Sequence, residues 1–167
     1  HFQKTDNKGY LSPFTQITLS GKNYWMYNSK DSRWGIKNHP EIKHTFDFKV
    51  FDTWYNYPDE LGRKFDLQLV RIEKNGKFGI ADCQLRELMP PQFQYFTLLY
   101  GPNIWKVGDA DKMGVYDMSK KQLILPVEFD EIKLNTAQAK PLLTVRQNKY
   151  WGQYDLNGKE ILPVIFE

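Results

Sequence analysis

The chain has 167 residues, of which 41% are hydrophobic and 16% aromatic, a composition that excludes a disordered segment and suffices for one substantial core. Its net charge of +3 comes from 23 basic and 20 acidic residues that are interspersed, so we expect no nucleic-acid partner. The single cysteine, Cys83, excludes a disulfide framework, and no apolar run approaches the roughly 18 residues of a membrane span.

The N-terminus begins at His1 with neither a methionine nor a basic, apolar leader. This start predicts a mature periplasmic or secreted chain whose signal peptide has been removed, or an excised fragment. A cytoplasmic location is the alternative. Residues 6–14 resemble residues 155–163, so the chain starts and stops at the same phase of a repeat. The sequence therefore predicts an open stack of repeats, with a small propeller-like closed arrangement as the alternative.

The repeat itself is a bulky residue followed by glycine and, three positions later, by an aspartate or its amide. Its four copies are Trp34-Gly35 with Asn38, Phe78-Gly79 with Asp82, Met113-Gly114 with Asp117, and Trp151-Gly152 with Asp155. A proline and then an aromatic residue follow in the last three copies. The aromatic residues delimit four repeats of 36 to 42 residues, 14–51, 51–93, 93–129 and 129–166, within a single predicted domain, 1–167.

Within a repeat, the pattern predicts about three short antiparallel strands joined by tight turns, and the whole chain is expected to be all-β. Residues 68–72 alternate and are rich in strand formers, residues 73–77 supply an Asn-Gly turn, and residues 78–82 begin the return strand. The proline should stand at a strand edge or bulge, because it cannot donate to a ladder. An insertion at residues 55–63 lengthens the second repeat, and its residues 58–61 hint at one helical turn.

The repeated glycine and aspartate are expected to be structural. A glycine inside a strand suggests a bulge, a positive φ or the close approach of a neighbouring backbone or ring. The aspartate is expected to accept backbone hydrogen bonds in the turn that follows it. A catalytic centre needs one constellation of residues, so four copies of a motif argue against catalysis.

The clearest copies, Lys77-Phe78-Gly79-Ile80, Met113-Gly114-Val115-Tyr116-Asp117 and residues 149–163, resemble the WG (KWG) repeat of bacterial proteins. Phe129-Asp130-Glu131-Ile132 matches the ending of that repeat. Two copies lack tryptophan, and the copy at Trp34 lacks the proline. The resemblance implies a β-rich repeat fold, and it implies no common reaction, metal or cofactor.

Catalytic and metal sites find little support. His39 and His44 are five residues apart with a proline behind the first, which does not match a zinc-protease helix and indicates a solvated loop. The adjacent carboxylates Asp59-Glu60 and Asp130-Glu131 are weak glycosidase candidates, because neighbours in a strand face opposite sides. Cys83 is expected to be a buried or half-buried thiol. We therefore expect no catalytic residue, no metal and no cofactor.

Aromatic residues crowd the half of the chain where the repeat is most degenerate. Because alternate strand residues face opposite sides, some of these rings should lie off the core and bind a partner. The candidates are Tyr24, Trp25, Trp54, Tyr55 and Tyr57. Packing of the insertion or capping of the terminal repeat is the alternative explanation.

The sequence thus favours a non-catalytic protein-protein interaction module. One alternative is an immunity protein that neutralises a bacterial toxin, and another is a cell-wall or glycan-binding module that stacks sugars on the same rings. If the candidate rings belong to the core, the next surface to consider is the outer face of the later repeats, near Tyr100 and Trp105.

Overall fold

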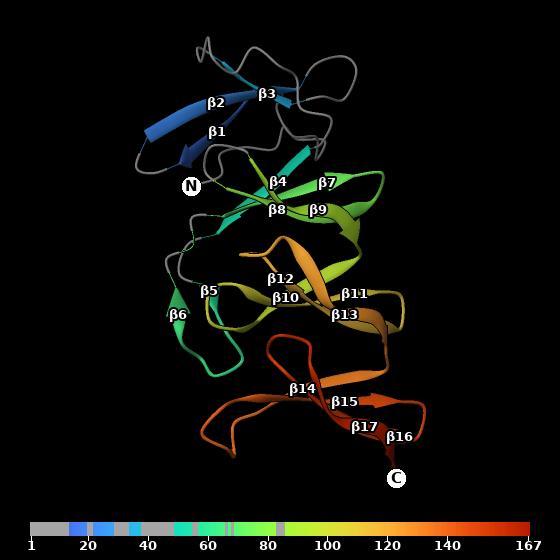
Figure 1. The fold of residues 1–167 in the computed structure, drawn as a ribbon. Coiled ribbons are helices and arrows are strands. Elements are labelled where there is room, and N and C mark those ends of the chain that lie inside the picture. The colour runs from blue at the N-terminus through green and yellow to red at the C-terminus, as the bar shows by residue number, and fades with distance from the viewer. Residues whose placement is uncertain are drawn as a thin grey trace. The chain divides into compact units, whose positions relative to one another are not determined.

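The computed structural model describes residues 14–19, 22–28, 34–37, 49–54, 57–65, 67, 69–82 and 86–167, with side chains only from residue 58 onward and not for Val70. Strands make up 67% of the described residues and none of these residues is helical (Figure 1). The predicted all-β class is therefore confirmed. The suspected helical turn at residues 58–61 is instead the start of a β-hairpin turn.

The strands form four antiparallel sheets and one short ribbon, and none of these sheets closes into a barrel. The first sheet contains β1 (Phe14–Leu19), β2 (Lys22–Asn28) and β3 (Trp34–Lys37), and the second contains β4 (Lys49–Trp54), β7 (Leu69–Lys74), β8 (Lys77–Ala81) and β9 (Glu87–Phe93). The third contains β10 (Tyr95–Tyr100), β11 (Ile104–Asp109), β12 (Lys112–Asp117) and β13 (Gln122–Phe129). The fourth contains β14 (Glu131–Asn135), β15 (Leu142–Gln147), β16 (Tyr150–Asp155) and β17 (Glu160–Phe166), and the ribbon pairs β5 (Tyr57–Pro58) with β6 (Lys64–Phe65). The sequence predicted about three strands in each repeat, and three of these sheets contain four.

The chain divides into two compact units, residues 1–55 with 68–92 and residues 56–67 with 93–167. The single domain expected from the sequence stays a prediction. The second unit holds the third and fourth sheets together with the β5–β6 ribbon, and most of the described side chains belong to it.

The turn between β7 and β8 has the predicted chemistry. Asn75 and Gly76 have φ angles of 52° and 75°, the two consecutive positive values of a type I′ turn. Asparagine and glycine tolerate this left-handed region better than other residues, so the local sequence determines where the hairpin reverses.

The repeated glycine pairs with the residue seven positions before it in three of the four sheets. Gly79, Gly114 and Gly152 pair with Ile72, Val107 and Val145, three β-branched residues with no exposed surface. In the first sheet the residue opposite Gly35 is Tyr27, and Asn28 pairs with Trp34. The residue seven positions before the glycine is therefore the partner in three sheets only.

A three-residue bulge crosses Gly114 and Gly152. Met113 pairs with Phe129 and Val115 pairs with Leu125, so that residues 126–128 face the single residue Gly114. The same irregularity places residues 163–165 opposite Gly152. The proline is the first residue of the bulge in both strands, as predicted, because it has no N–H to give to the ladder.

The bulge leaves no space for a side chain at the glycine. A Cβ atom at Gly79 would lie 2.3 Å from the carbonyl oxygen of Met89, and one at Gly114 would lie 2.7 Å from that of Leu125. At Gly152 a Cβ would lie 2.7 Å from Cγ2 of Val164. None of the three glycines has a positive φ, so the close approach of the last strand is the reason why glycine recurs at this position.

The repeated aspartate accepts backbone hydrogen bonds in the following turn, as predicted. Asp117 accepts from the N–H of Ser119 at 2.8 Å, and Asp82 accepts from that of Arg86 at 2.9 Å. Asp155 accepts from the N–H groups of Asn157 and Lys159 at 2.8 and 2.9 Å. These bonds fix the start of the final strand in the second, third and fourth sheets.

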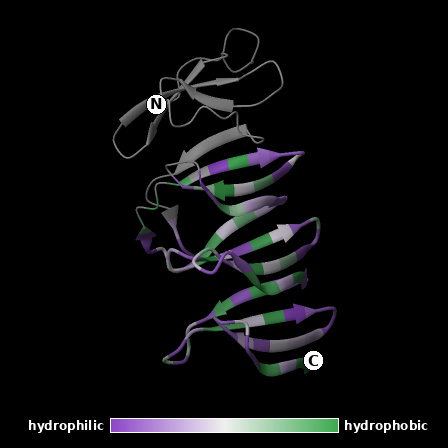
Figure 2. Ribbon diagram, turned by 45° about the horizontal axis from the view of Figure 1, so that its top comes forward, coloured by the Kyte–Doolittle hydropathy of each residue, from purple (hydrophilic) through white to green (hydrophobic). Residues whose placement is uncertain are grey.

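The core of the second unit lies between its two sheets. Leu99, Val115, Leu125 and Phe129 of the third sheet form one buried cluster with Ile132, Leu143 and Val145 of the fourth. The ring of Phe129 also packs edge-on against Tyr154, with centroids 5.9 Å apart. Hydrophobic and hydrophilic residues alternate along the strands of both sheets (Figure 2), so each sheet can bury one face against its neighbour.

Circular dichroism provides a direct check of the fold class. The spectrum of the purified chain should be that of a β protein with little helix. A helix content above about a fifth, in comparison with a globular average near one third, would contradict the four-sheet fold.

Substitution of the crossed glycines tests the bulge contact. Gly79→Ala and Gly114→Ala should each lower the free energy of unfolding by about 1 to 3 kcal/mol, because the new methyl group collides with backbone that cannot move away easily. Gly76→Asn is the matched control, since Gly76 has a positive φ and open space around it and asparagine accepts that conformation. Unchanged melting of both alanine variants would show that the glycine spacing has another cause.

Candidate functional site

The aromatic site expected from the sequence stays a prediction. Tyr24 and Trp25 lie in β2, Trp54 ends β4 and Tyr57 begins β5, but their side chains lie outside the described part of the chain. Tyr55 itself lies outside the described residues. The same is true of His39, His44 and Cys83.

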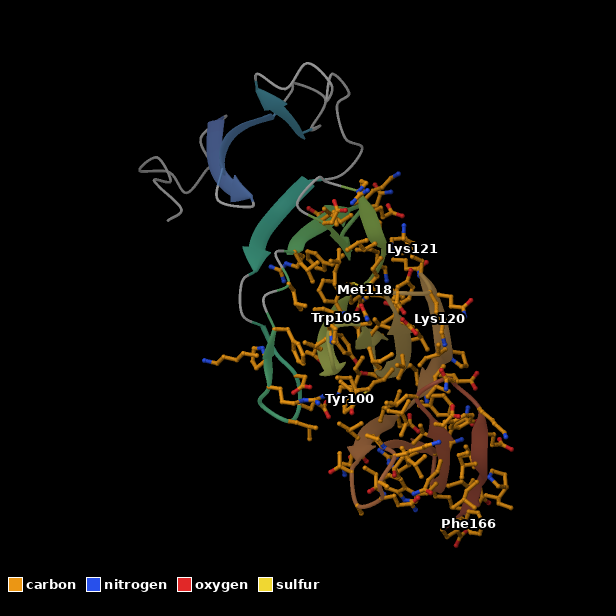
Figure 3. All side chains as sticks on the ribbon, turned by 60° about the vertical axis from the view of Figure 1, so that its left-hand side comes forward. Tyr100, Trp105, Met118, Lys120, Lys121 and Phe166 are labelled. Atoms are coloured by element: carbon orange, nitrogen blue, oxygen red, sulfur yellow. The ribbon has the colours of Figure 1, made fainter. Side chains whose placement is uncertain are left out.

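Trp105 is not on an outer face, so the second expected surface needs correction. Its side chain has no exposed area and packs edge-on against Phe96, with ring centroids 5.9 Å apart (Figure 3). Trp105 occupies the register position of Leu143, which is also fully buried. Tyr100 is partly buried, and the guanidinium carbon of Arg63 lies 4.4 Å from the centre of its ring.

The apolar residues that the structure does expose gather on the final strand. Ile161, Leu162, Ile165 and Phe166 of β17 are 45%, 42%, 63% and 49% exposed, and we call these four residues the β17 surface. Figure 3 shows Phe166 at the free end of the fourth sheet. Single exposed apolar residues are ordinary on a protein surface, but Leu162 and Phe166 occupy the positions of Leu125 and Phe129, which lie in one buried cluster, so these two exposed residues share a face and indicate an interaction site.

The equivalent strands bury the same positions. The leucine or methionine before the proline is 0% exposed at Met89 and 1% at Leu125, against 42% at Leu162. The aromatic residue after the proline is 2% exposed at Phe129, against 49% at Phe166. Leu125 and Phe129 are buried because the β14–β15 hairpin covers them, and no described hairpin covers β17.

A partner is more easily accommodated on the face of β17 than along its edge. Among the strands that the structure describes, β17 pairs with β16 alone, so its other side is an edge of the fourth sheet. However, Pro163 begins a bulge there and cannot donate a hydrogen bond, two devices that discourage strand addition. A partner would therefore pack across the face through Leu162 and Phe166.

The residue that directly follows the bulged strand is acidic in both the third and the fourth sheet. The carboxylate of Asp130, after β13, accepts hydrogen bonds from Lys112 at 2.5 Å and from the N–H of Asn148 at 2.5 Å. The hydrogen bonds from Lys112 and then from Asn148 hold the pKa of Asp130 below its ordinary value. Glu167 takes the same place after β17 and forms an ion pair with Lys149.

The outer face of the fourth sheet is mixed in polarity. Gln153 stands where the third sheet has Val115, which is fully buried, and its side-chain amide lies 3.5 Å from the hydroxyl of Thr144. A patch of apolar anchors beside polar groups is typical of interfaces that form and separate, whereas permanent interfaces are more uniformly apolar.

A second ordered feature is the turn of the β5–β6 ribbon. The buried carboxylate of Asp59 accepts hydrogen bonds from the N–H groups of Leu61 and Arg63 at 3.0 Å each and from that of Gly101 at 3.2 Å. The guanidinium group of Arg63 adds two more, at 2.9 and 2.7 Å. Glu60 forms an ion pair with Lys106. Both carboxylates of this candidate pair are thus engaged in attaching the ribbon to the third sheet.

This turn was not predicted, although the sequence contains a pattern that indicates it. Asp59-Glu60-Leu61-Gly62-Arg63 has the pattern of the repeat turn at residues 155–159, with a glycine fourth and a basic residue fifth. The backbone bonds also agree, since the N–H of Gly62 donates to Asp59 at 2.9 Å and that of Gly158 to Asp155 at 3.1 Å. The insertion therefore uses a copy of the repeat's own turn.

Two further properties concern the described residues alone. They contain no group of three or more histidine, cysteine, aspartate or glutamate side chains placed to hold a metal ion. They also contain no helix that is long and apolar enough to cross a membrane. Comparison with protein-family models, curated proteins and solved structures found no match to this chain.

The ribbon turn predicts a specific pH dependence. Burial would raise the pKa of Asp59, but the hydrogen bonds from the Arg63 side chain and from the Arg63 and Gly101 backbone outweigh it and hold that pKa below its ordinary value. The ionised carboxylate therefore stabilises the fold above the unfolded pKa of about 3.9, and this contribution is lost as pH falls through the folded value. Asp59→Asn should lower the free energy of unfolding by about 1 to 3 kcal/mol at pH 7.

The measurement is urea unfolding of the wild type and Asp59→Asn between pH 3 and pH 7. The difference between the two proteins should be largest near neutral pH and should shrink below about pH 4. Asp111→Asn, at an exposed turn residue, is the matched control and should change stability little at any pH. A difference that does not depend on pH would contradict the role of the charge.

Proposed function

We propose that this chain is a non-catalytic protein-binding module built from WG-like repeats. The observation that carries the proposal is the exposure of Leu162 and Phe166. The equivalent residues of the third sheet, Leu125 and Phe129 in β13, are buried. The face of β13 packs against the β14–β15 hairpin, and the equivalent face of β17 is exposed. The exposed face therefore has the apolar residues that such packing needs. The apolar patch, the polar neighbour Gln153 and the charged Glu167 together form a binding surface of ordinary composition.

The carboxylates that were weighed as catalytic pairs support the same proposal. Asp59 and Glu60 are engaged with Arg63 and Lys106, as described above. Asp130 binds Lys112, while Glu131 forms ion pairs with Lys133 and Arg146, at 2.5 and 3.3 Å. These side chains stabilise turns and strand ends, and a general acid or base would instead need to face a substrate.

Two narrower functions remain predictions from the sequence. The partner of an immunity protein would be a bacterial toxin, and the partner of a glycan-binding module would be a cell-wall sugar. The glycan-binding function is expected to use the candidate rings Tyr24, Trp25, Trp54, Tyr55 and Tyr57, whereas no residue in the sequence argues specifically for an immunity protein. The β17 surface favours a protein partner, because its anchors include the aliphatic residues Ile161, Leu162 and Ile165, whereas sugars are bound mainly on aromatic rings.

The proposal is tested by capture with matched variants. Immobilised wild-type chain should retain one or a few proteins from an extract of the source cells, identified by mass spectrometry, and Phe166→Glu should lose them. Leu61→Glu, which also replaces an exposed apolar residue, in this case on the ribbon and 46% exposed, is the control and should retain them. Equal capture by all three chains would show that the β17 surface is not the binding site.

A further inference from the structure

We propose that the turn between β7 and β8 is a site of spontaneous covalent modification, at which Asn75 loses its side-chain amide and becomes aspartate or isoaspartate. The sequence contains two asparagines that are followed by glycine, in Asn75-Gly76 and in Asn157-Gly158. A following glycine offers the least steric resistance to this reaction, because it has no Cβ atom. The structure opens the first pair to the reaction and restrains the second. This inference goes beyond the proposed binding function and does not depend on it.

The reaction needs no reactant other than water. The backbone nitrogen of Gly76 forms a bond to Cγ of Asn75, and the bond between Cγ and the side-chain nitrogen breaks. That nitrogen takes up the proton of the Gly76 N–H and leaves as ammonia, which leaves a succinimide ring. Water then adds to one of the two ring carbonyls and breaks its bond to the ring nitrogen. Opening at Cγ gives aspartate, and opening at the backbone carbonyl gives isoaspartate, in which the main chain runs through the former side chain.

The surroundings of Asn75 permit the ring to close. Asn75 and Gly76 are both exposed, and a Cβ atom at Gly76 would meet no atom of the described residues within 4 Å. The N–H of Gly76 donates a hydrogen bond to the carboxylate of Glu73 at 3.1 Å, in an exposed position. Hydrogen bonds that are exposed to solvent open at little cost, so this one slows the attack without preventing it.

The second pair has the same two residues in a restrained turn. A Cβ atom at Gly158 would lie 2.3 Å from the carbonyl oxygen of Ile124, so strand β13 lies directly against this turn. The N–H of Gly158 donates to the backbone carbonyl of Asp155 at 3.1 Å, and the side-chain oxygen of Asn157 accepts from Nζ of Lys120 at 3.1 Å. Ring closure at Asn157 must break these contacts together, whereas an intramolecular attack is fast only when the two atoms can approach each other.

The product would change the charge of a groove beside the β7–β8 turn. Lys74 and Lys77 pair across the turn, and together with Asn75 they line part of a groove of about 540 Å³. Two ammonium groups attract a nearby anion, so they favour the negative charge that develops during the attack and the carboxylate that results. Aspartate tolerates the positive φ of Asn75, but isoaspartate lengthens the main chain and would distort the turn.

Incubation of the purified chain at neutral pH and subsequent peptide mapping test the proposal. A glutamate-specific protease releases residues 74–87, and tandem mass spectrometry compares this peptide with the one that contains Asn157. The Asn75 peptide should gain the mass that replacement of an amide by an acid adds, and an isoaspartyl methyltransferase should methylate part of it. Its conversion should exceed that at Asn157 by about tenfold or more, because the Asn157 turn must first open.

The same incubation in urea is the matched control. Both turns are then unfolded, so the two asparagines should react at similar rates. A folded chain in which Asn75 stays unchanged, or in which Asn157 reacts as fast, overturns the proposal. A difference that persists in urea would come from the neighbouring sequence and not from the fold, and it would also overturn the proposal.

Hydroxylamine provides a second measurement, because it attacks the succinimide ring and cleaves the chain there. The folded protein should yield fragments 1–75 and 76–167, and cleavage after Asn157 should appear only in urea. Gly76→Ala, if it folds by circular dichroism, should lose most of the conversion at Asn75, because the added methyl group obstructs ring closure. Absence of cleavage after Asn75, or unchanged conversion in Gly76→Ala, contradicts the succinimide route.

Discussion

The fold of the described sheets depends on one contact, the crossing of a three-residue bulge over a glycine. At Gly114 the carbonyl of Leu125 occupies the space that any side chain would need, and Gly79 and Gly152 repeat this arrangement. Because the last strand crosses the glycine, its aromatic residue, Phe129, pairs with Met113. The chain then leaves the third sheet at Asp130 and enters the fourth sheet at Glu131. Glycine supplies the space and proline removes the N–H that would otherwise lack a partner.

Because of this contact, each repeat ends with an apolar pair that the next repeat can cover. Each crossing leaves a leucine or methionine and a phenylalanine on the last strand, and in the second unit the following hairpin covers that pair. The residue after Phe129, Asp130, accepts a hydrogen bond from the N–H of Asn148, in the turn between β15 and β16. At β17 the pair is Leu162 and Phe166, the acid is Glu167, and the face remains exposed. The proposed binding surface thus consists of the same residue positions that pack between the third and fourth sheets.

The sequence predicted those features that depend on a few neighbouring residues. The β class, the Asn75-Gly76 turn, the close approach at Gly114 and the hydrogen bonds of Asp155 follow from local chemistry that recurs at a fixed spacing. Features that depend on distant packing were missed. Trp105 is buried because of the strands around it, and Leu162 is exposed although its local sequence is almost that of the buried Leu125. No local pattern separates these cases, because burial depends on packing against distant strands, as Leu125 packs against Leu143 and Val145.

The central claim, that β17 carries a repeat face ready to be covered, is tested most directly by extending the chain. A second copy of residues 131–167 added after Glu167 would place a new β14–β15 hairpin over Leu162 and Phe166. In repeat proteins each added interface contributes to stability, so the denaturant midpoint of the extended chain should exceed that of the original. An unchanged midpoint, with the added segment unfolded by circular dichroism, would contradict the claim that β17 is prepared to receive a further hairpin.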